Sequence, residues 1–181
     1  MTKKETVAVY IDGGNLYRRL KDFNIPKNKN RFNYLAFIKY LVGDRGIVSK
    51  RYYIGTVKNV DGSKKSEKMV RGQQKFLDGI EREGFEIKRG KIMYDEGNIR
   101  EKGVDVKLAT DLISNAINNK YDMAILVSND SDFVPAIKEV QKIGKQVWNI
   151  NFPKRKSFHL NQICNKRITI NTINPFQTKE K

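Results

Sequence analysis

The sequence predicts an α/β fold with a mostly parallel central sheet and helices on both faces. Strand-like and helix-like segments alternate along the whole chain, which is the order of elements found in parallel-sheet proteins. The segments VAVYI at 7–11 and MAILVS at 123–128 are nearly uninterrupted apolar runs, as expected of strands that helices cover on both faces. Gly43, Gly84 and Gly144 each follow a helix-like segment, where a glycine commonly ends a helix.

The individual elements follow from local patterns of residues. Strands are predicted, from β-branched and aromatic residues, at 7–11, 50–57, 85–94, 123–128, 145–150 and 167–170. Helices are predicted, from apolar residues at helical spacing, at 15–23, 31–43, 68–83, 104–118, 131–143 and 157–163. The residues expected on the buried side of the fourth helix are Leu108, Leu112, Ile113 and Ile117.

Two loops and the chain end complete the predicted organisation. The strand at 85–94 is expected to continue as a hairpin through the turn sequence DEGN, and the polar segment 58–66 is expected to be a mobile basic flap. The sequence has no internal repeat and no low-complexity linker. One domain is therefore expected over residues 1–173, followed by a flexible tail over 174–181.

The chain is strongly basic, which limits the kinds of partner it suits. It has 36 Lys and Arg against 20 Asp and Glu, a formal charge of +16 and a pI near 9.9. Such an excess favours a polyanionic partner, with nucleic acid before an anionic membrane surface. No apolar run is long enough to span a bilayer or to serve as a signal peptide. The single cysteine, Cys164, excludes an internal disulfide framework and a multi-cysteine zinc site, so a cytoplasmic location is expected.

Acidic residues are concentrated in one stretch of this basic chain. Residues 101–150 hold six Lys or Arg and seven Asp or Glu, a net charge of −1, so the other residues together carry +17. This contrast predicts a local acidic site framed by a surface that attracts anions.

Three of the acids stand directly after two predicted strands. Asp12 follows the first strand, and Asp130 and Asp132 follow the fourth. Ligands of open α/β sheets bind beyond the carboxyl ends of parallel strands, so these carboxylates converge if the two strands are neighbours. Asp105 begins a predicted helix and is expected to supply a fourth carboxylate.

Four close carboxylates repel one another, and a bound divalent cation removes that repulsion. Oxygen-only ligands suit Mg²⁺ or Mn²⁺. Such a cation can activate a water and stabilise charge on a phosphoryl oxygen, so the acids and the basic surface together predict metal-assisted phosphodiester hydrolysis. The alternative is that each acid only caps a helix or faces a helix dipole, and it is strongest for Asp12 alone and for Asp105.

Nearby polar residues extend the candidate site. Asn15 lies three residues after Asp12, and its amide is expected to position the scissile phosphate or the attacking water. Ser128 and Asn129 are expected either to donate hydrogen bonds to a phosphate or to the acids, or only to shape the turn. Asp111 lies on a different side of its helix from the acid at the helix start and is expected to be solvated or structural.

Several other chemistries lack the residues they need. The one histidine, His159, excludes a nuclease that uses two histidines, and no GxSxG motif presents a serine to it. There is no GxxxxGK[ST] loop, and YIDGGN lacks the GxGxxG pattern of a dinucleotide site.

Three segments carry a recognisable pattern: VAVYIDGGNLY, KGVDVKLATDLI and YDMAILVSNDSDFVPAIKEVQKIGKQV. In this order and spacing they resemble the NYN domain family, most closely its LabA-like bacterial branch, over residues 6–170. That family is similar in fold to PIN and FLAP nuclease domains, and it uses clustered aspartates with Mg²⁺ or Mn²⁺ to cut RNA. The residues that the resemblance implies as catalytic are Asp12, Asn15, Asp105, Asp130 and Asp132, and the four aspartates are those implied as metal ligands. Where the third segment more often reads SGDSDF, Asn129 replaces the glycine and is expected to tolerate a left-handed backbone.

Basic residues with aromatic neighbours predict where nucleic acid lies. The clusters are Arg18, Arg19 and Lys21; Lys27, Lys29 and Arg31; Lys64, Lys65, Lys68 and Arg71; and Lys154, Arg155 and Lys156. The neighbouring rings are Tyr17, Phe32, Phe152 and Phe158, and phosphate contacts beside stackable rings suit single-stranded nucleic acid. Each cluster taken alone also fits an ordinary solvated face. The preferred contacts are Arg18, Lys64, Lys65, Lys68, Arg71 and Lys102.

The sequence therefore favours a metal-dependent ribonuclease that acts on single-stranded RNA, as a monomer or a homodimer. The alternatives are a non-catalytic RNA-binding or regulatory module of the same fold, a FLAP-type DNA nuclease, and a phosphatase acting on small nucleotides. The basic surface does not distinguish RNA from DNA, because phosphate contacts are blind to the sugar.

Overall fold

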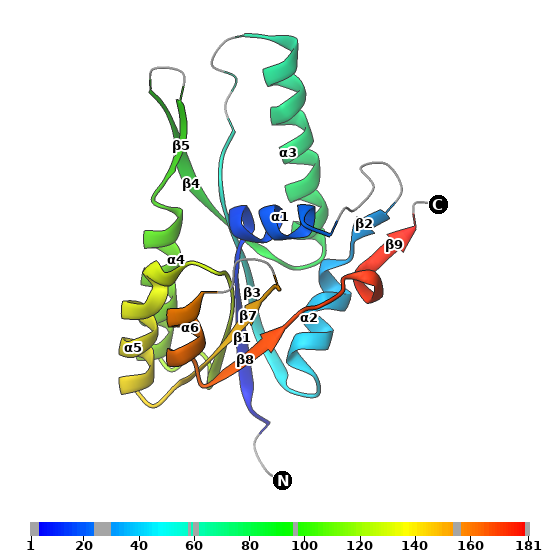
Figure 1. The fold of residues 1–181 in the computed structure, drawn as a ribbon. Coiled ribbons are helices and arrows are strands. Elements are labelled where there is room, and N and C mark those ends of the chain that lie inside the picture. The colour runs from blue at the N-terminus through cyan, green and yellow to red at the C-terminus, as the bar shows by residue number, and fades with distance from the viewer. Residues whose placement is uncertain are drawn as a thin grey trace.

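The computed structural model describes residues 4–23, 30–57, 59, 62–95, 98–153 and 157–179 (Figure 1). Several predicted features lie outside these described residues. They are Lys27, Lys29, the side chain of Arg31, residues 154–156, and residues 58, 60 and 61 of the predicted flap.

A mostly parallel sheet forms the centre of the fold. Its strands are β1 Thr6–Asp12, β3 Gly46–Gly55, β4 Glu86–Asp95, β5 Asn98–Lys102, β6 Met123–Val127, β7 Gln146–Asn151 and β8 Lys166–Thr169. In the described part of the chain the strand order is β5-β4-β3-β1-β6-β7-β8, and β5 alone runs antiparallel to its neighbour. β1 and β6 are adjacent, with Ile11 opposite Val127. The predicted α/β class and the expected hairpin after β4 are therefore confirmed.

Helices cover both faces of this sheet (Figure 1). On one face are α1 Gly13–Lys21, α2 Tyr34–Val42 and α3 Lys64–Arg82, and on the other are α4 Val104–Ile117, α5 Val134–Lys142 and α6 Phe158–Ile163. Alternate residues of β1 belong to the two resulting cores, because successive side chains of a strand point to opposite faces. Val7, Val9 and Ile11 pack into the first core, and Ala8 and Tyr10 pack into the second.

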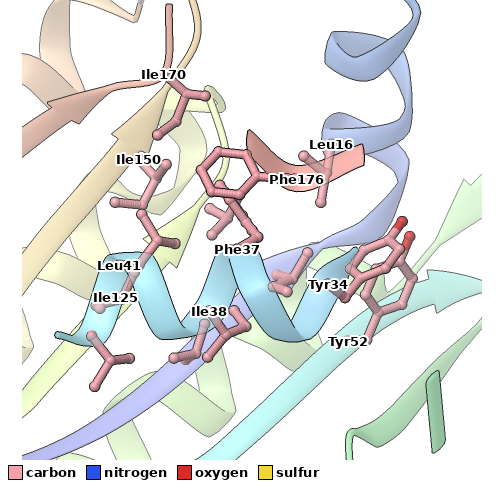
Figure 2. Close-up of a cluster of buried hydrophobic side chains, with 14 of the residues drawn as sticks. Leu16, Tyr34, Phe37, Ile38, Leu41, Tyr52, Ile125, Ile150, Ile170 and Phe176 are labelled. Atoms are coloured by element: carbon pink, nitrogen blue, oxygen red, sulfur yellow. The ribbon is translucent and has the colours of Figure 1, made fainter. Parts of the chain in front are cut away.

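The C-terminal segment is part of the first core. Phe176, on the short turn η2 Asn174–Phe176, is 4% exposed, and its ring centroid lies 5.3 Å from that of Phe37 on α2 (Figure 2). The next residues form β9 Gln177–Lys179, which pairs antiparallel with β2 Asn30–Phe32. Residues 174–179, where the sequence predicted a flexible tail, are thus held by a buried aromatic anchor and a two-stranded ladder.

Two helices begin at residues other than those predicted, and a capping residue explains each start. The helix predicted from residue 31 begins only at Tyr34, because Asn33 caps α2 by accepting a hydrogen bond from Ala36 N at 2.9 Å. α3 begins at Lys64, earlier than predicted, because Ser63 Oγ accepts a hydrogen bond from Ser66 N at 3.1 Å. Lys64 therefore belongs to a helix and not to a loop.

The fourth predicted helix differs from expectation in one buried position. Leu108 and Leu112 of α4 are fully buried and Ile113 is partly buried, as predicted. Ile117 is 64% exposed, so its predicted burial is wrong. The buried stripe of α4 consists of Val104, Leu108, Leu112 and Ala116, and Ile117 lies outside it.

Two elements extend past the sheet at the edge where α1 begins (Figure 1). They are α3 and the β4–β5 pair. In α3 the buried residues are Leu77 and Ile80, both near its C-terminal end, so its N-terminal half projects from the body. No helix in the described part of the chain is both long enough and apolar enough to cross a membrane.

Candidate acidic site at the carboxyl edge of the sheet

Asp12 ends β1 and is 5% exposed. Its Oδ1 accepts a hydrogen bond from Asn15 N at 2.9 Å, and its Oδ2 accepts one from Ser128 Oγ at 3.0 Å. Asp12 therefore caps α1, as the alternative interpretation expected, and is also tied to the residue that follows β6. Each carboxylate oxygen keeps capacity for a further partner, since an ionised carboxylate offers about four lone-pair directions.

The glycine after Asp12 is required by close packing. A Cβ atom on Gly13 would lie 2.4 Å from Cε1 of Tyr52, a ring that is 2% exposed. Only glycine lets the backbone pass this ring, so the DGG turn sets the point at which α1 leaves the sheet and where Asp12 caps it.

Ser128 joins two of the predicted acids. It is 1% exposed, and its Oγ accepts a hydrogen bond from Asp130 N at 3.1 Å while donating to Asp12. Asp130 Oδ1 in turn accepts from Asp132 N at 3.0 Å, which caps the short turn η1 Ser131–Phe133. The expectation that Ser128 bonds to the acids is confirmed. The left-handed backbone expected at Asn129 is not found, because Asn119 is the one described non-glycine residue with positive φ.

Asp105 reaches the same region from the first turn of α4. The start of α4 lies against β4, where a Cβ atom on Gly90 would come within 2.2 Å of Val104 Cγ2, so a glycine is needed there too. Asp105 is exposed and makes no hydrogen bond or ion pair with any described residue. Its carboxylate is therefore available to a ligand.

The four aspartates share one electrostatic field. Burial raises the pKa of Asp12 from 3.8 to about 6; the Asp105 charge raises it further, while the bonds from Asn15 and Ser128 and the Arg18 charge oppose the rise. Partial burial raises the pKa of Asp105, and Asp130 and Asp132 add to it. The charge of Asp105 thus acts on Asp12, and the charges of Asp130 and Asp132 act on Asp105.

The chemical type of the donor atoms suits a hard divalent cation. All are carboxylate oxygens, which suit Mg²⁺ or Mn²⁺, and the raised pKa of buried Asp12 marks negative charge that a cation would stabilise. Asp12 is buried, whereas Asp105 and Asp132 are exposed. Among the residues that the structure describes, no three His, Cys, Asp or Glu side chains form a ready-made cage for a metal ion.

Two further predicted residues stand beside the acids. Asn15 is half-buried, and its side-chain amide makes no hydrogen bond to any described residue, so it is available to a ligand. Arg18 is exposed, and its charge opposes the pKa rise of both Asp12 and Asp105.

Asp111 has the structural role that the sequence predicted as one of two possibilities. Its Oδ2 accepts a hydrogen bond from the Tyr53 hydroxyl at 2.8 Å and lies 3.8 Å from Arg51 Nη1. These partners hold the partly buried Asp111 against β3.

Asn149 supports the site and was not predicted from the sequence, and Asn151 is a second buried amide on the same strand. Asn149 is 1% exposed, and its Nδ2 donates to the carbonyl oxygens of Ser128 at 2.8 Å and Leu126 at 3.3 Å. Asn151, also 1% exposed, donates to Asn161 at 2.9 Å. The sequence signal for both residues is the presence of two asparagines at alternate positions of the otherwise apolar strand QVWNIN. A buried amide needs hydrogen-bond partners, so such a pair indicates polar contacts within the core.

The basic surface follows α3. Lys64, Lys65, Lys68 and Arg71 are exposed on this helix, and Arg71 pairs with Glu67 at 2.9 Å. A hollow of about 380 Å³ extends the surface beyond the predicted cluster, and the residues lining it are Arg71, Gln74, Lys75, Asp78 and Arg82. Arg89 of β4 reaches the same helix, donating to Gln74 Oε1 at 3.3 Å. Lys102 is exposed at the end of β5, just before α4.

Only two of the four predicted stacking rings are accessible. Phe152 is 2% exposed, and Phe32 packs against Tyr34 and Phe37, so both are core residues. Tyr17 and Phe158 are 58% and 67% exposed.

Comparison with known proteins agrees with this fold. Residues 6–171 match the NYN domain, and the chain belongs to this family, which is grouped with the PIN-like nucleases. It is 30% identical over 141 residues to the uncharacterised protein MJ0482 of Methanocaldococcus jannaschii, covering 78% of this chain and 45% of that protein. The chain therefore spans less than half of this relative. The fold is similar to the crystal structure of VPA0982, a protein of unknown function from Vibrio parahaemolyticus, with a TM-score of 0.73 and 22% identity over 98% of this chain and 99% of the other.

Proposed function

We propose that this protein is a metal-dependent ribonuclease of the LabA-like branch of the family, acting on single-stranded RNA in the cytoplasm. One observation carries the proposal: Ser128 Oγ joins the Asp12 carboxylate at the end of β1 to the backbone of Asp130 after β6, so acids of two neighbouring strands meet at one edge of the sheet on a chain of charge +16. Clustered carboxylates on so basic a protein suit a site where a cation meets a polyanion.

Each proposed catalytic residue has a role that its position supports. Asp12, Asp105, Asp130 and Asp132 would hold Mg²⁺ or Mn²⁺. When bound, such a cation supplies activation of a water and stabilisation of charge on the phosphoryl oxygen. Ser128 holds the Asp12 carboxylate in a fixed orientation through its 3.0 Å hydrogen bond.

Polar and basic side chains around the acids position the substrate. The Asn15 amide binds a phosphate oxygen or orients the attacking water, and Arg18 pairs with a phosphate beside the acids. Lys64, Lys65, Lys68 and Arg71 on α3, with Lys102 at the end of β5, hold more distant phosphates of the same strand.

The test is cleavage of a labelled single-stranded RNA in Mn²⁺, in Mg²⁺ and in EDTA, by the wild-type protein and by Asp12→Asn. Asparagine can still accept the bond from Asn15 N, so the cap of α1 is kept while the charge is removed. Asp44→Asn, an exposed acid in the turn after α2, is the matched control. The expected result is cleavage that needs metal, is lost in Asp12→Asn and persists in Asp44→Asn.

A second measurement detects binding of the cation independently of catalytic activity. Mn²⁺ should raise the melting temperature of the wild-type protein, and this shift should vanish in Asp12→Asn. Tight RNA binding with neither cleavage nor a Mn²⁺ shift would contradict the proposal and favour the non-catalytic RNA-binding module. Parallel DNA oligonucleotides test the FLAP-type alternative.

A further inference from the structure

Tyr17 is a large aromatic side chain without a structural role in the described part of the protein. Five tyrosines are buried there: Tyr10, Tyr34, Tyr52, Tyr53 and Tyr121. Tyr40 is exposed but packs on Phe176, with ring centroids 5.3 Å apart. Tyr17 is 58% exposed, and among the described residues it makes no hydrogen bond and packs on no other aromatic ring.

The position of Tyr17 relates it to the candidate site. It lies on α1, the helix that Asp12 caps, about 7.5 Å along the helix axis from that cap. The next residue, Arg18, is also exposed, and its charge acts on both Asp12 and Asp105. The exposed side of α1 thus carries an aromatic ring beside the cation that stands next to the acids.

A second cation orients the ring. Lys21 Nζ lies 4.2 Å from the ring centroid of Tyr17, one turn further along α1. Such a contact holds the ring through its negative π face and leaves the other face for a flat partner. Lys21 also adds positive charge where a phosphate would follow a stacked base.

We propose that Tyr17 is a base-stacking platform, on which an unpaired nucleobase next to the scissile phosphate lies. The choice of RNA as the ligand rests on the proposed function. What the proposal adds is the part of the RNA that Tyr17 binds, which is an unpaired base. A base in a duplex is already stacked on both faces and cannot reach an isolated ring, whereas every base of a single strand has a free π face. Tyr17 therefore selects unpaired strands without reading their sequence.

The experiment measures binding of a short single-stranded RNA in EDTA, where metal-dependent cleavage cannot occur. Tyr17→Ala should weaken binding by about tenfold, the effect expected for the loss of one stacked base. Tyr17→Trp should restore it. Tyr40→Ala, an equally exposed tyrosine on α2, is the matched control and should leave binding unchanged.

RNA that contains an abasic nucleotide tests whether the lost affinity comes from a missing contact with a base. One abasic position along the strand should weaken the wild-type protein to the level of Tyr17→Ala and have no further effect on that variant. Unchanged binding by Tyr17→Ala, or an equal loss on a fully abasic strand, would overturn the proposal. Binding in EDTA does not depend on hydrolysis. The effects of Tyr17→Ala and of an abasic position on binding can therefore be observed even if the protein does not cleave RNA, and cleavage can be observed even if these effects are absent.

Discussion

Ser128 Oγ lies 3.0 Å from Asp12 Oδ2 and 3.1 Å from Asp130 N, so one buried hydroxyl joins the ends of β1 and β6. The hydroxyl donates to the carboxylate and accepts from the backbone amide. Asn149 fixes the carbonyl of the same serine from the neighbouring strand. The acidic site is therefore supported by a polar network within the sheet edge and not by the acids alone.

Ser128→Ala should both destabilise the fold and change the titration of Asp12. It leaves a buried carboxylate oxygen and the Asp130 amide without this partner, which should lower the free energy of unfolding by about 1–3 kcal/mol. The ionised form of Asp12 loses a hydrogen bond, so its pKa should rise further above about 6. Cleavage should then fall more at pH 6.5 than at pH 8, measured as a pH profile beside urea unfolding. Ser131→Ala, exposed in the adjacent turn, should do neither.

Asp12→Asn should stabilise the metal-free protein at high pH. The pKa of Asp12 is about 6 in the folded state and 3.8 in its unperturbed state, so the folded protein binds more protons between these values and loses stability as pH rises through them. Removing the charge should raise the free energy of unfolding by up to about 3 kcal/mol above pH 6 and by little near pH 4. Urea unfolding in EDTA at both pH values measures this. A variant less stable than wild type at pH 8 would contradict it.

Gly13→Ala should destabilise the fold, although the turn has no positive φ. The added Cβ would meet the buried Tyr52 ring at 2.4 Å, and overpacking of this kind costs about 1–3 kcal/mol. Gly79→Ala is the matched control, because it lies within α3 with no heavy atom within 4 Å of an added Cβ. That change should stabilise the helix by about 0.5–1 kcal/mol. Chemical denaturation of the two variants compares them directly, and equal effects would count against the role given to Tyr52.

Lys75→Ala with Arg82→Ala should weaken RNA binding and its dependence on salt. Both residues line the hollow on α3. Each phosphate contact removed should lower the slope of log affinity against log salt by about 0.7 for a single strand. Titrations in EDTA at several salt concentrations give this slope. Lys120→Ala, exposed in the turn before β6 at the opposite edge of the sheet, should leave the slope unchanged, and an equal change in both would indicate only a general charge effect.

The parts of this protein that local patterns encode could be predicted from the sequence. The strands before Asp12 and Asp130 were recognised as buried because they are long apolar runs. Their adjacency was left as the condition for their carboxylates to converge, and the pairing of β1 with β6 meets it. The start of α3 was predicted at residue 68 and lies at Lys64, although Ser63 is a favourable cap that the sequence displays.

What could not be predicted depends on contacts between distant segments. Phe176 is buried because it packs against aromatic residues of α2. The short polar segment around it has no apolar periodicity that would predict this contact. Exposure of Ile117 depends on which face of α4 packs against its neighbours, and the spacing of apolar residues did not exclude this position from that face. The bond from Ser128 to an acid was expected, but the role of Asn149 depends on which strands become neighbours, so it emerged only with the sheet order.

The strand order also determines when the acids first meet during synthesis. β1 is made early, but its neighbour β6 begins more than 110 residues later, and Asp132 follows Asp12 by 120 positions. At the usual pace of translation, roughly 5–20 residues per second, that interval lasts about 6 to 24 seconds. From residue 82 onward a nascent chain carries Asp12 and the basic helix α3, but Asp130 and Asp132, which complete the carboxylate cluster, are made only later. A growing chain can therefore attract RNA before it has assembled the site proposed to cut it.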